Sequence, residues 1–266
     1  MKVVEYIANR KKTIFSFEII PPLKGKGIED LCAGIDPLME FNPPFINVTY
    51  HREEYEYKKM GNGLLKKVSI RKRPGTVGIC AALMNRYKVD AIPHIICGGF
   101  TKEETESALI DLKFLGVDNI LALRGDPMKN ESAFVPTQGG NAYALDLIEQ
   151  INEMNNGQYL YEETKNSPSN FCIGTAGYPE KHFEAMNLST DLKHLKKKVD
   201  AGAEFIVTQL FYDNKKFFDL TDTIRSNATF RTYTDIQYKE MSETKTFYEV
   251  KTFRLLGSSY IKMITN

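Results

Sequence analysis

Short apolar runs alternate with amphipathic segments along residues 1–225 of the chain. Apolar runs of the length typical of buried strands lie at residues 13–20, 45–50, 91–97, 119–123, 171–176 and 205–211. Segments with helix-like patterns lie at residues 28–41, 102–115, 143–154, 191–201 and 215–225. Residues 76–87 could be a strand or a helix by composition, and their length and alanines favour a helix. Strands that alternate regularly with helices predict a parallel sheet covered by helices.

Two architectures are built in this way, the doubly wound sheet and the (β/α)8 TIM barrel. In both, ligands bind at the carboxyl ends of the strands. Polar residues fall at these ends in the present sequence: Glu18, Thr49, His94, Asp126, Tyr178 and Gln209. No G-x-G-x-x-G sequence follows the first strand, which argues against a dinucleotide-binding sheet of the doubly wound type. The pattern therefore favours an α/β barrel, with six clear β/α units.

Two stretches interrupt this alternation. Residues 51–74 are highly charged and have no stable period, so they are interpreted as an inserted excursion. Residues 155–169 are rich in Asn, Gly, Ser and Pro and are predicted to form a loop. Elsewhere the helix ends are clear, since Thr101 with Glu104 forms a capping box and Gly116 follows the last helical residue.

Composition narrows the class of protein. The chain has 266 residues, of which 42% are hydrophobic and 26% charged, with a formal net charge of +1. A charge this close to zero gives no electrostatic support to binding of nucleic acid or of an anionic membrane. No run of 18 apolar residues and no signal-peptide core occur. The four cysteines are scattered, with no metal-ligand spacing, and are typical of reduced thiols in a cytoplasmic protein.

Glu18 is the first candidate for chemistry because it lies within an apolar strand. Burial there would raise the pKa of its carboxyl group and make it a proton donor near neutral pH. The alternative is a glutamate that faces solvent or forms a salt bridge. Asp126, in the sequence LRGDP, either takes part in catalysis or only caps a turn. His94 lies in a strand, where a packed core histidine is the commoner case.

Three further polar features point to the same edge of the sheet. Gln209 places an amide in a strand where apolar residues are expected, and a buried amide needs a partner from the protein or from a ligand. Tyr178 and His182 belong to a polar cluster in a loop. Lys198 ends a run of three lysines that predicts a solvated helix face, but it adjoins Val199 and could turn toward a ligand.

Six sequence motifs occur in order along the chain. They are FSFEIIPP (15–22), NVTY (47–50), PHIIC (93–97), LALRGDP (121–127), GYPEKH (177–182) and DLKHLKKKVDAGAEFIVTQLFYD (191–213). This ordered set, which extends from residue 1 to about residue 220, resembles the methylenetetrahydrofolate reductase family.

The resemblance implies a (β/α)8 barrel that holds FAD non-covalently at the strand ends. It further implies ping-pong hydride transfer from NADH or NADPH to the flavin, and then to 5,10-methylenetetrahydrofolate, which becomes 5-methyltetrahydrofolate. Such an enzyme serves one-carbon metabolism and methionine biosynthesis. By the same resemblance, we expect a cytoplasmic homo-oligomer with no nucleic-acid partner, no membrane partner and no metal.

The resemblance also assigns roles to individual residues. Glu18 looks like the general acid that protonates the folate, Asp126 like the carboxylate near the flavin and pterin, and Gln209 like the amide that binds the pterin. The residues that resemble FAD ligands are Thr49, His94, Arg124, Asp126, Tyr178, His182, Asp191 and Lys198. Ala176 and Gly177 are expected to let the backbone approach the cofactor. Lys197 and His194 depart from the family, which often has arginine and asparagine there.

The resemblance fades near residue 220. A complete barrel of roughly 250 residues would need about 60 residues for two more β/α units, and residues 226–266 supply 41. We therefore divide the chain into a barrel domain, 1–225, and a divergent or truncated segment, 226–266. Segments 247–250 and 253–256 could each form a strand. The segment is either a divergent closure of the barrel or the foreign end of a truncated or frame-disrupted chain, and we favour the second.

Three hypotheses about function follow. The first is the FAD-dependent reductase, and the second is a catalytically inactive remnant that keeps a flavin-site sequence. The third is an unrelated barrel lyase or aldolase. This third class would use a Schiff-base lysine or a metal ion, and the sequence places neither.

Overall fold

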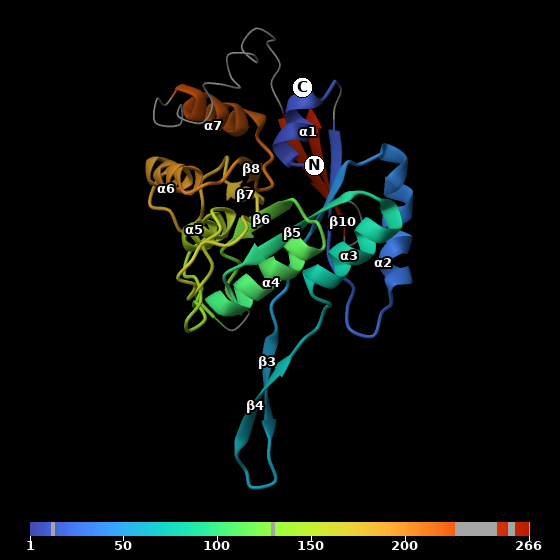
Figure 1. Cartoon of the computed structure of the whole chain (residues 1–266), viewed down its shortest axis with the longest axis vertical. Coiled ribbons are helices and arrows are strands. Elements are labelled where there is room, and N and C mark those ends of the chain that lie inside the picture. Colours follow the sequence, from blue (N-terminus) through green and yellow to red (C-terminus); the bar gives the residue numbers. More distant parts are fainter. Residues whose placement is uncertain (12–13, 129–130, 227–248, 255–258, 266) are drawn as a thin grey trace.

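Six parallel strands form the centre of the molecule (Figure 1). The computed structural model describes residues 1–11, 14–128, 131–226, 249–254 and 259–265. The parallel strands are β1 (Ile14–Ile19), β2 (Phe45–Val48), β5 (Asp90–Ile96), β6 (Asn119–Leu123), β7 (Cys172–Gly177) and β8 (Phe205–Thr208). They lie in the order β1-β2-β5-β6-β7-β8, each parallel to its neighbour. The fold is α/β, as predicted, and this array is consistent with a partial TIM barrel.

The helices between these strands lie close to where the hydrophobic spacing predicts them. They are α2 (Ile28–Ile35), α3 (Thr76–Tyr87), α4 (Lys102–Phe114), α5 (Ala144–Asn155), α6 (Leu188–Asp200) and α7 (Asn214–Ser226). The predicted capping box is confirmed, since Thr101 Oγ1 accepts from the Glu104 N–H and Glu104 Oε2 accepts from the Thr101 N–H. None of the described helices combines the length and the apolar character that a membrane span requires.

Two predicted helix boundaries are wrong. The segment predicted as one helix over 28–41 changes at Asp36 into a 3-10 helix, Asp36–Phe41, because Pro37 cannot donate a backbone hydrogen bond. Helix α6 begins three residues earlier than predicted, because the Asn187 side chain caps it by accepting from the Thr190 N–H at 2.9 Å.

The helices pack on one face of the sheet through two apolar clusters. One cluster joins β1, β2 and β5 to α2 and α3 and contains Ile46 and Leu83. The other joins β5, β6 and β7 to α4 and α5 and contains Ile120 and Leu147. All four side chains are at most 1% exposed. The four cysteines are free and buried, in agreement with the prediction of reduced thiols.

The opposite face of the sheet is covered at its amino end by helix α1 (Val3–Asn9). The cluster beneath this helix consists of Val3, Phe45, Ile92, Leu121, Cys172 and Phe205. Hydrogen bonds hold the start of the helix against β6. The Val3 N–H donates to Asn119 Oδ1 at 2.7 Å, and Asn119 Nδ2 donates to the Met1 carbonyl at 2.9 Å. The Tyr6 hydroxyl donates to Asp90 at 2.8 Å. This end of the sheet is therefore packed and hydrogen-bonded.

Residues 51–74 contain regular structure that the sequence pattern did not indicate. Strands β3 (Glu54–Lys59) and β4 (Leu65–Ile70) form an antiparallel hairpin that stands away from the rest of the molecule (Figure 1). The predicted excursion is thus present, but its two strands were not predicted, because both are nearly all exposed and neither has a buried face to impose an alternating pattern.

The C-terminal segment adds two strands to the other side of β1. Strand β10 (Ser259–Thr265) pairs antiparallel with β1, and β9 (Glu249–Arg254) pairs antiparallel with β10. Apart from β3 and β4, the described strands therefore form one eight-stranded sheet with β8 and β9 at its two ends. Part of the predicted strand 253–256 lies outside the described residues, as do residues 227–248.

Candidate active site at the carboxyl ends of the strands

A carboxyl group and an imidazole meet on the inner face of the sheet. Glu18 lies near the end of β1, and His94 lies in β5, two strands away. Glu18 Oε2 is 3.6 Å from His94 Nε2, and the two side chains are only 18% and 7% exposed. Of the alternatives open for Glu18, the structure thus has a largely buried glutamate with an ionisable partner.

Strand β2, between them, contributes a polar side chain that we did not single out from the sequence. Asn47 stands directly beside Glu18 in the parallel register and is 2% exposed. Its Oδ1 atom has no hydrogen-bond partner among the described residues. A buried acceptor without a donor costs free energy of folding. It therefore indicates that a group outside the described residues, such as a ligand, donates a hydrogen bond to it. The signal in the sequence was an amide within the apolar run FINV.

Thr49 follows β2 and is held against the end of β1. Its N–H and its Oγ1 both donate to the Ile19 carbonyl, at 3.1 and 3.0 Å. The adjacent Tyr50 ring packs against Phe100 with 5.0 Å between centroids. Thr49 is thus fixed in position on the same edge as Glu18.

A second group of predicted residues gathers at the ends of β6 and β7. Arg124 forms a bidentate pair with Glu184, at 2.6 and 2.9 Å, and lies over the ring of Phe134. The hydrogen bonds to Glu184 raise the pKa of Arg124 above its usual range. Asp126 is exposed and follows Gly125, whose φ of +85° allows the chain to turn sharply after β6.

Tyr178, His182 and Asp191 contact one another beyond β7. The Tyr178 and His182 rings meet edge to face at 4.6 Å, and the His182 N–H donates to Asp191 Oδ2 at 2.8 Å. Burial lowers the pKa of His182. Burial, with the nearby carboxylates of Asp126 and Asp191, raises the pKa of Tyr178. Asp126 therefore lies within electrostatic range of this group.

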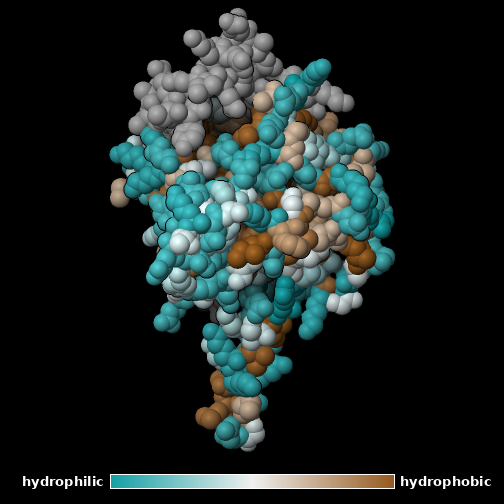
Figure 2. Space-filling model, in the orientation of Figure 1, coloured by the Kyte–Doolittle hydropathy of each residue, from teal (hydrophilic) through white to brown (hydrophobic). Residues whose placement is uncertain are grey.

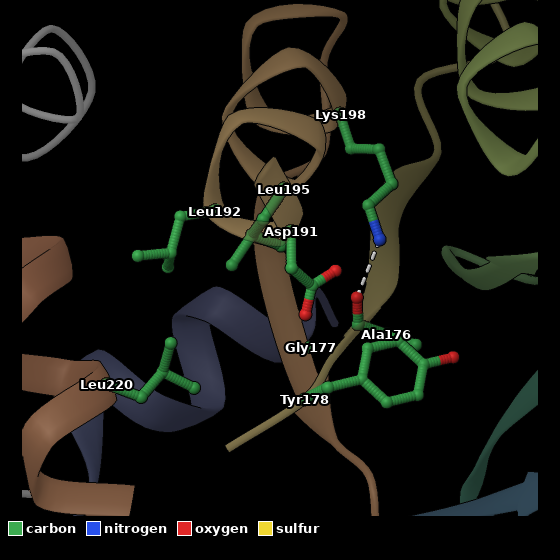
Figure 3. A pocket seen from close by; sticks show the side chains of 8 residues that line it. All are labelled: Ala176, Gly177, Tyr178, Asp191, Leu192, Leu195, Lys198 and Leu220. Atoms are coloured by element: carbon green, nitrogen blue, oxygen red, sulfur yellow. Dashed lines mark hydrogen bonds between the residues drawn. The ribbon is translucent and has the colours of Figure 1, made fainter. Parts of the chain in front are cut away.

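Lys198 turns inward from helix α6, whereas Lys197 and His194 are exposed. The Nζ atom of Lys198 donates to the Ala176 carbonyl at 2.7 Å, beside Asp191 and Tyr178 (Figure 3). Burial lowers the pKa of Lys198 to about 8, although Asp191 opposes the shift. The ammonium is thus a poorly solvated cation that an anionic ligand would stabilise.

One prediction about this edge is wrong. Gln209 is not a buried amide, because β8 ends at Thr208 and Gln209 is exposed, with its Oε1 accepting from the Leu210 N–H. At Gly177 a Cβ would lie 2.7 Å from Ile206 Cγ2, so the lack of a side chain there serves strand packing.

A cavity of about 840 Å³ extends from His94 toward the β3–β4 hairpin. Its wall includes residues from the beginning of α3 and of α4, together with Met128, Glu131 and residues 135–137. Arg52 and Glu131 form an ion pair in it at 2.7 Å. Among the described residues, no group of three His, Cys, Asp or Glu side chains is placed to hold a metal ion.

The predicted residues thus form two groups along one edge of the sheet. Glu18, His94 and Thr49 lie at β1, β2 and β5, while the Arg124 to Lys198 group lies at β6, β7 and α6. The first group presents a carboxyl and an imidazole, which can exchange protons. The second presents cations and donors suited to an elongated anionic ligand.

Sequence comparison places these residues in a family. The methylenetetrahydrofolate reductase family pattern matches residues 3–236. The chain is 35% identical over 237 residues to methylenetetrahydrofolate reductase (NADH) 1 of Zea mays, covering 85% of this chain and 35% of that protein. It is 31% identical over 209 residues to 5,10-methylenetetrahydrofolate reductase of Pectobacterium carotovorum subsp. carotovorum, covering 78% of this chain and 57% of that protein.

The chain thus spans about a third of the maize protein's length and somewhat more than half of the bacterial one. Among solved structures, 2,3-dimethylmalate lyase aligns with a TM-score of 0.47 and 9% identity, over 84% of this chain and 68% of that one. This last likeness is too weak to bear on function, whereas the sequence matches are ordered and extensive. The chain belongs to the methylenetetrahydrofolate reductase family.

Proposed function

We propose that this chain reduces 5,10-methylenetetrahydrofolate to 5-methyltetrahydrofolate, with NADH or NADPH as the hydride donor and FAD as the bound cofactor. The observation that carries the proposal is the Glu18–His94 pair, a carboxyl group 3.6 Å from an imidazole on the inner face of the sheet. Family membership supports the substrate and the nicotinamide donor.

The second group of residues fits FAD in its chemistry. A dinucleotide needs cations for its pyrophosphate and donors or acceptors for its ribose and ribityl hydroxyls. Lys198 offers a poorly solvated ammonium, Arg124 a guanidinium, and Asp191 a carboxylate, all at one edge. Thr49, His94, Asp126, Tyr178 and His182 complete the proposed set. When bound, FAD would supply a two-electron carrier between the nicotinamide and the folate.

Glu18 is proposed as the general acid. A proton on Oε2 would pass to the bridging nitrogen of the folate, whose five-membered ring then opens to a cationic iminium carbon able to accept hydride. Asp126 is proposed to stabilise that cation by its negative charge. His94, 3.6 Å from Glu18, holds the carboxyl in place and provides a route for its reprotonation. Gln209 is proposed to bind the pterin with an exposed amide.

The decisive experiment separates the two half-reactions in the Glu18→Gln variant. Reduction of the flavin by NADH should stay within about twofold of wild type, because Glu18 takes no part in that step. Folate reduction should fall by about 10²–10⁴-fold, as expected for loss of a general acid. The matched control is Glu149→Gln, an exposed glutamate on α5, which should change neither rate.

Two results would contradict the proposal in different ways. Full folate turnover by Glu18→Gln would refute the acid assignment alone. A purified wild-type chain that takes up no flavin and oxidises no NADH would refute the reductase proposal and favour the inactive family remnant.

A further inference from the structure

The β3–β4 hairpin, which we call the arm (residues 54–70), is poorly supported by the rest of the chain. Its tip is closed by hydrogen bonds from the Met60 N–H to the Leu64 carbonyl and from the Gly63 N–H to the Met60 carbonyl, and Gly63 takes a φ of +79°. Both strands are almost wholly exposed, and together they form a separate two-stranded sheet. An isolated hairpin of this size is at best marginally stable in water, which indicates that the arm has a partner.

One face of the arm carries aromatic, aliphatic and basic side chains. Cross-strand partners share a face, so Tyr55, Tyr57 and Leu65 lie on the same side as Lys59 and Lys67. Near the body, Tyr55 lines the cavity described above. Beyond the body the same face continues with Tyr57 and Leu65, which are 62% and 60% exposed. The part of this face that lines the cavity thus continues into a part that is exposed to solvent.

The positive charge on the outer half of the arm limits the kinds of surface that can bind to it. Residues 57–68 contain four lysines, Lys58, Lys59, Lys66 and Lys67, and no acidic residue. Two arms laid side by side would bring these lysines together, and opposed like charges destabilise a sheet. Pairing of one arm with another is therefore disfavoured, and the partner surface should be apolar and acidic.

Helix α4 presents such a surface. Ile110 and Phe114 are one helical turn apart, and they are 47% and 91% exposed. The carboxylate of Asp111 lies next to Ile110 on the same helix, whereas Glu103 and Glu106 accept hydrogen bonds from the Tyr161 hydroxyl and the Leu160 N–H. The space-filling view shows hydrophobic residues both along the arm and over α4 (Figure 2). The apolar pair with the adjacent Asp111 is complementary to the outer half of the arm.

We propose that the outer half of this face of the arm, with Tyr57 and Leu65, docks on α4 of a second copy of this chain. These two side chains would cover Ile110 and Phe114, while Lys59 and Lys67 on the same face would approach Asp111. Because each copy carries both surfaces, a twofold arrangement forms the contact twice and closes the assembly. This contact is independent of the proposed catalytic function.

Sedimentation of the full chain over a range of concentrations tests the proposal. Wild type should form a dimer that weakens with added salt, since charges contribute to it. Tyr57→Ser with Leu65→Ser, and separately Phe114→Ser, should each weaken association by about tenfold or more, as expected for buried apolar anchors. Tyr212→Ser removes an aromatic side chain that is 88% exposed outside both surfaces, and it should leave association unchanged.

Charge reversal shows whether the two surfaces meet. Lys59→Glu and Asp111→Lys should each weaken the dimer, and the two together in one chain should restore it at least in part. Circular dichroism of each variant verifies that it is folded. A wild-type chain that stays monomeric at high concentration would overturn the proposal. A dimer that keeps its affinity in the arm variants or in Phe114→Ser would overturn it equally.

Discussion

At the amino end of the parallel sheet the buried polar groups are paired with one another, whereas at the carboxyl end several are not. Asn119, beneath α1, accepts from the Val3 N–H and donates to the Met1 carbonyl. Toward the other end, Asn47 Oδ1, Thr175 Oγ1 and Thr208 Oγ1 are buried with no hydrogen-bond partner among the described residues. At the amino end of the sheet, the chain itself thus supplies the hydrogen-bond partners of these buried groups. At the carboxyl end, the described residues leave several of them without a partner.

This difference separates stability from function. A fully paired buried group contributes to folding, whereas an unpaired one costs free energy unless a ligand completes it. The carboxyl end also holds the Glu18–His94 pair and the poorly solvated Lys198. Ligands of α/β sheets bind at this end, so its unpaired groups are expected to be completed by ligand.

The largest predicted effect is at the amino end. Val3 is 2% exposed, and Val3→Asp would bury a carboxylate without a partner, which should lower the free energy of unfolding by about 3–5 kcal/mol. Denaturation by urea measures this. Ala8→Asp, at an exposed position of the same helix, should cost less than about 1 kcal/mol. Equal losses from the two variants would mean that α1 is not packed as described.

The same substitution at both ends tests the contrast directly. Asn119→Leu should lower the free energy of unfolding by about 1–3 kcal/mol, because the buried Val3 N–H loses its acceptor. Asn47→Leu should be neutral or stabilising by up to about 1 kcal/mol, because it removes an acceptor that has no donor. Chemical denaturation without ligand compares the two. If Asn47→Leu were the more damaging, the proposed division between the two ends would be wrong.

Lys198 gives a pH-dependent test at the carboxyl end. Its pKa is about 8 in the folded chain, against 10.5 for an ordinary lysine side chain in water, so the folded state releases this proton first. The cost of the buried charge is full below pH 8 and is relieved as the pH rises toward 10.5. Lys198→Met should therefore stabilise the ligand-free chain by about 1–2 kcal/mol at pH 7.

The advantage of Lys198→Met should shrink as the pH is raised from 8 to 10, which thermal or chemical unfolding across that range would show. Lys197→Met, at an exposed position of the same helix, should show no such trend. A stabilisation that is independent of pH would mean that removal of the charge is not its cause.

The smallest predicted effect concerns the Arg124–Glu184 pair. Hydrogen bonding to Arg124 lowers the pKa of Glu184. The pair therefore stabilises the fold above the ordinary pKa of a glutamate, and this contribution is lost as the pH falls through the lowered value. Because the Glu184 side chain is 36% exposed, Glu184→Gln should cost only about 0.5–1 kcal/mol at pH 7. The loss should vanish near pH 3, and a constant loss would exclude the ion pair as its origin.

Much of the fold could be predicted from local patterns. The helix over 76–87 coincides with α3, and the capping box at Thr101 and Glu104 is present. Each of the six parallel strands overlaps a predicted apolar run, because a buried strand must be apolar along its whole length. The exposed arm escaped prediction for the same reason, since no buried face imposes a pattern on it.

The candidate site was predictable only in part. Glu18 and His94 were recognised as unusual residues in apolar strands, but their separation of 3.6 Å across β2 depends on strand order and register. Asn47 was overlooked, because an amide in a strand is informative only once its burial and lack of a partner are known. Gln209 was assigned to the interior, because the end of β8 depends on pairing with β7, where Gly177 faces Thr208.

The sequence by itself determined the elements and the family, because hydrophobic periodicity and ordered motifs are properties of the chain that need no partner. Only the tertiary structure decided which polar groups meet, and which end of the sheet leaves them unpaired. It also decided that β10 runs antiparallel beside β1, since strand pairing between residues far apart in the chain is fixed by packing.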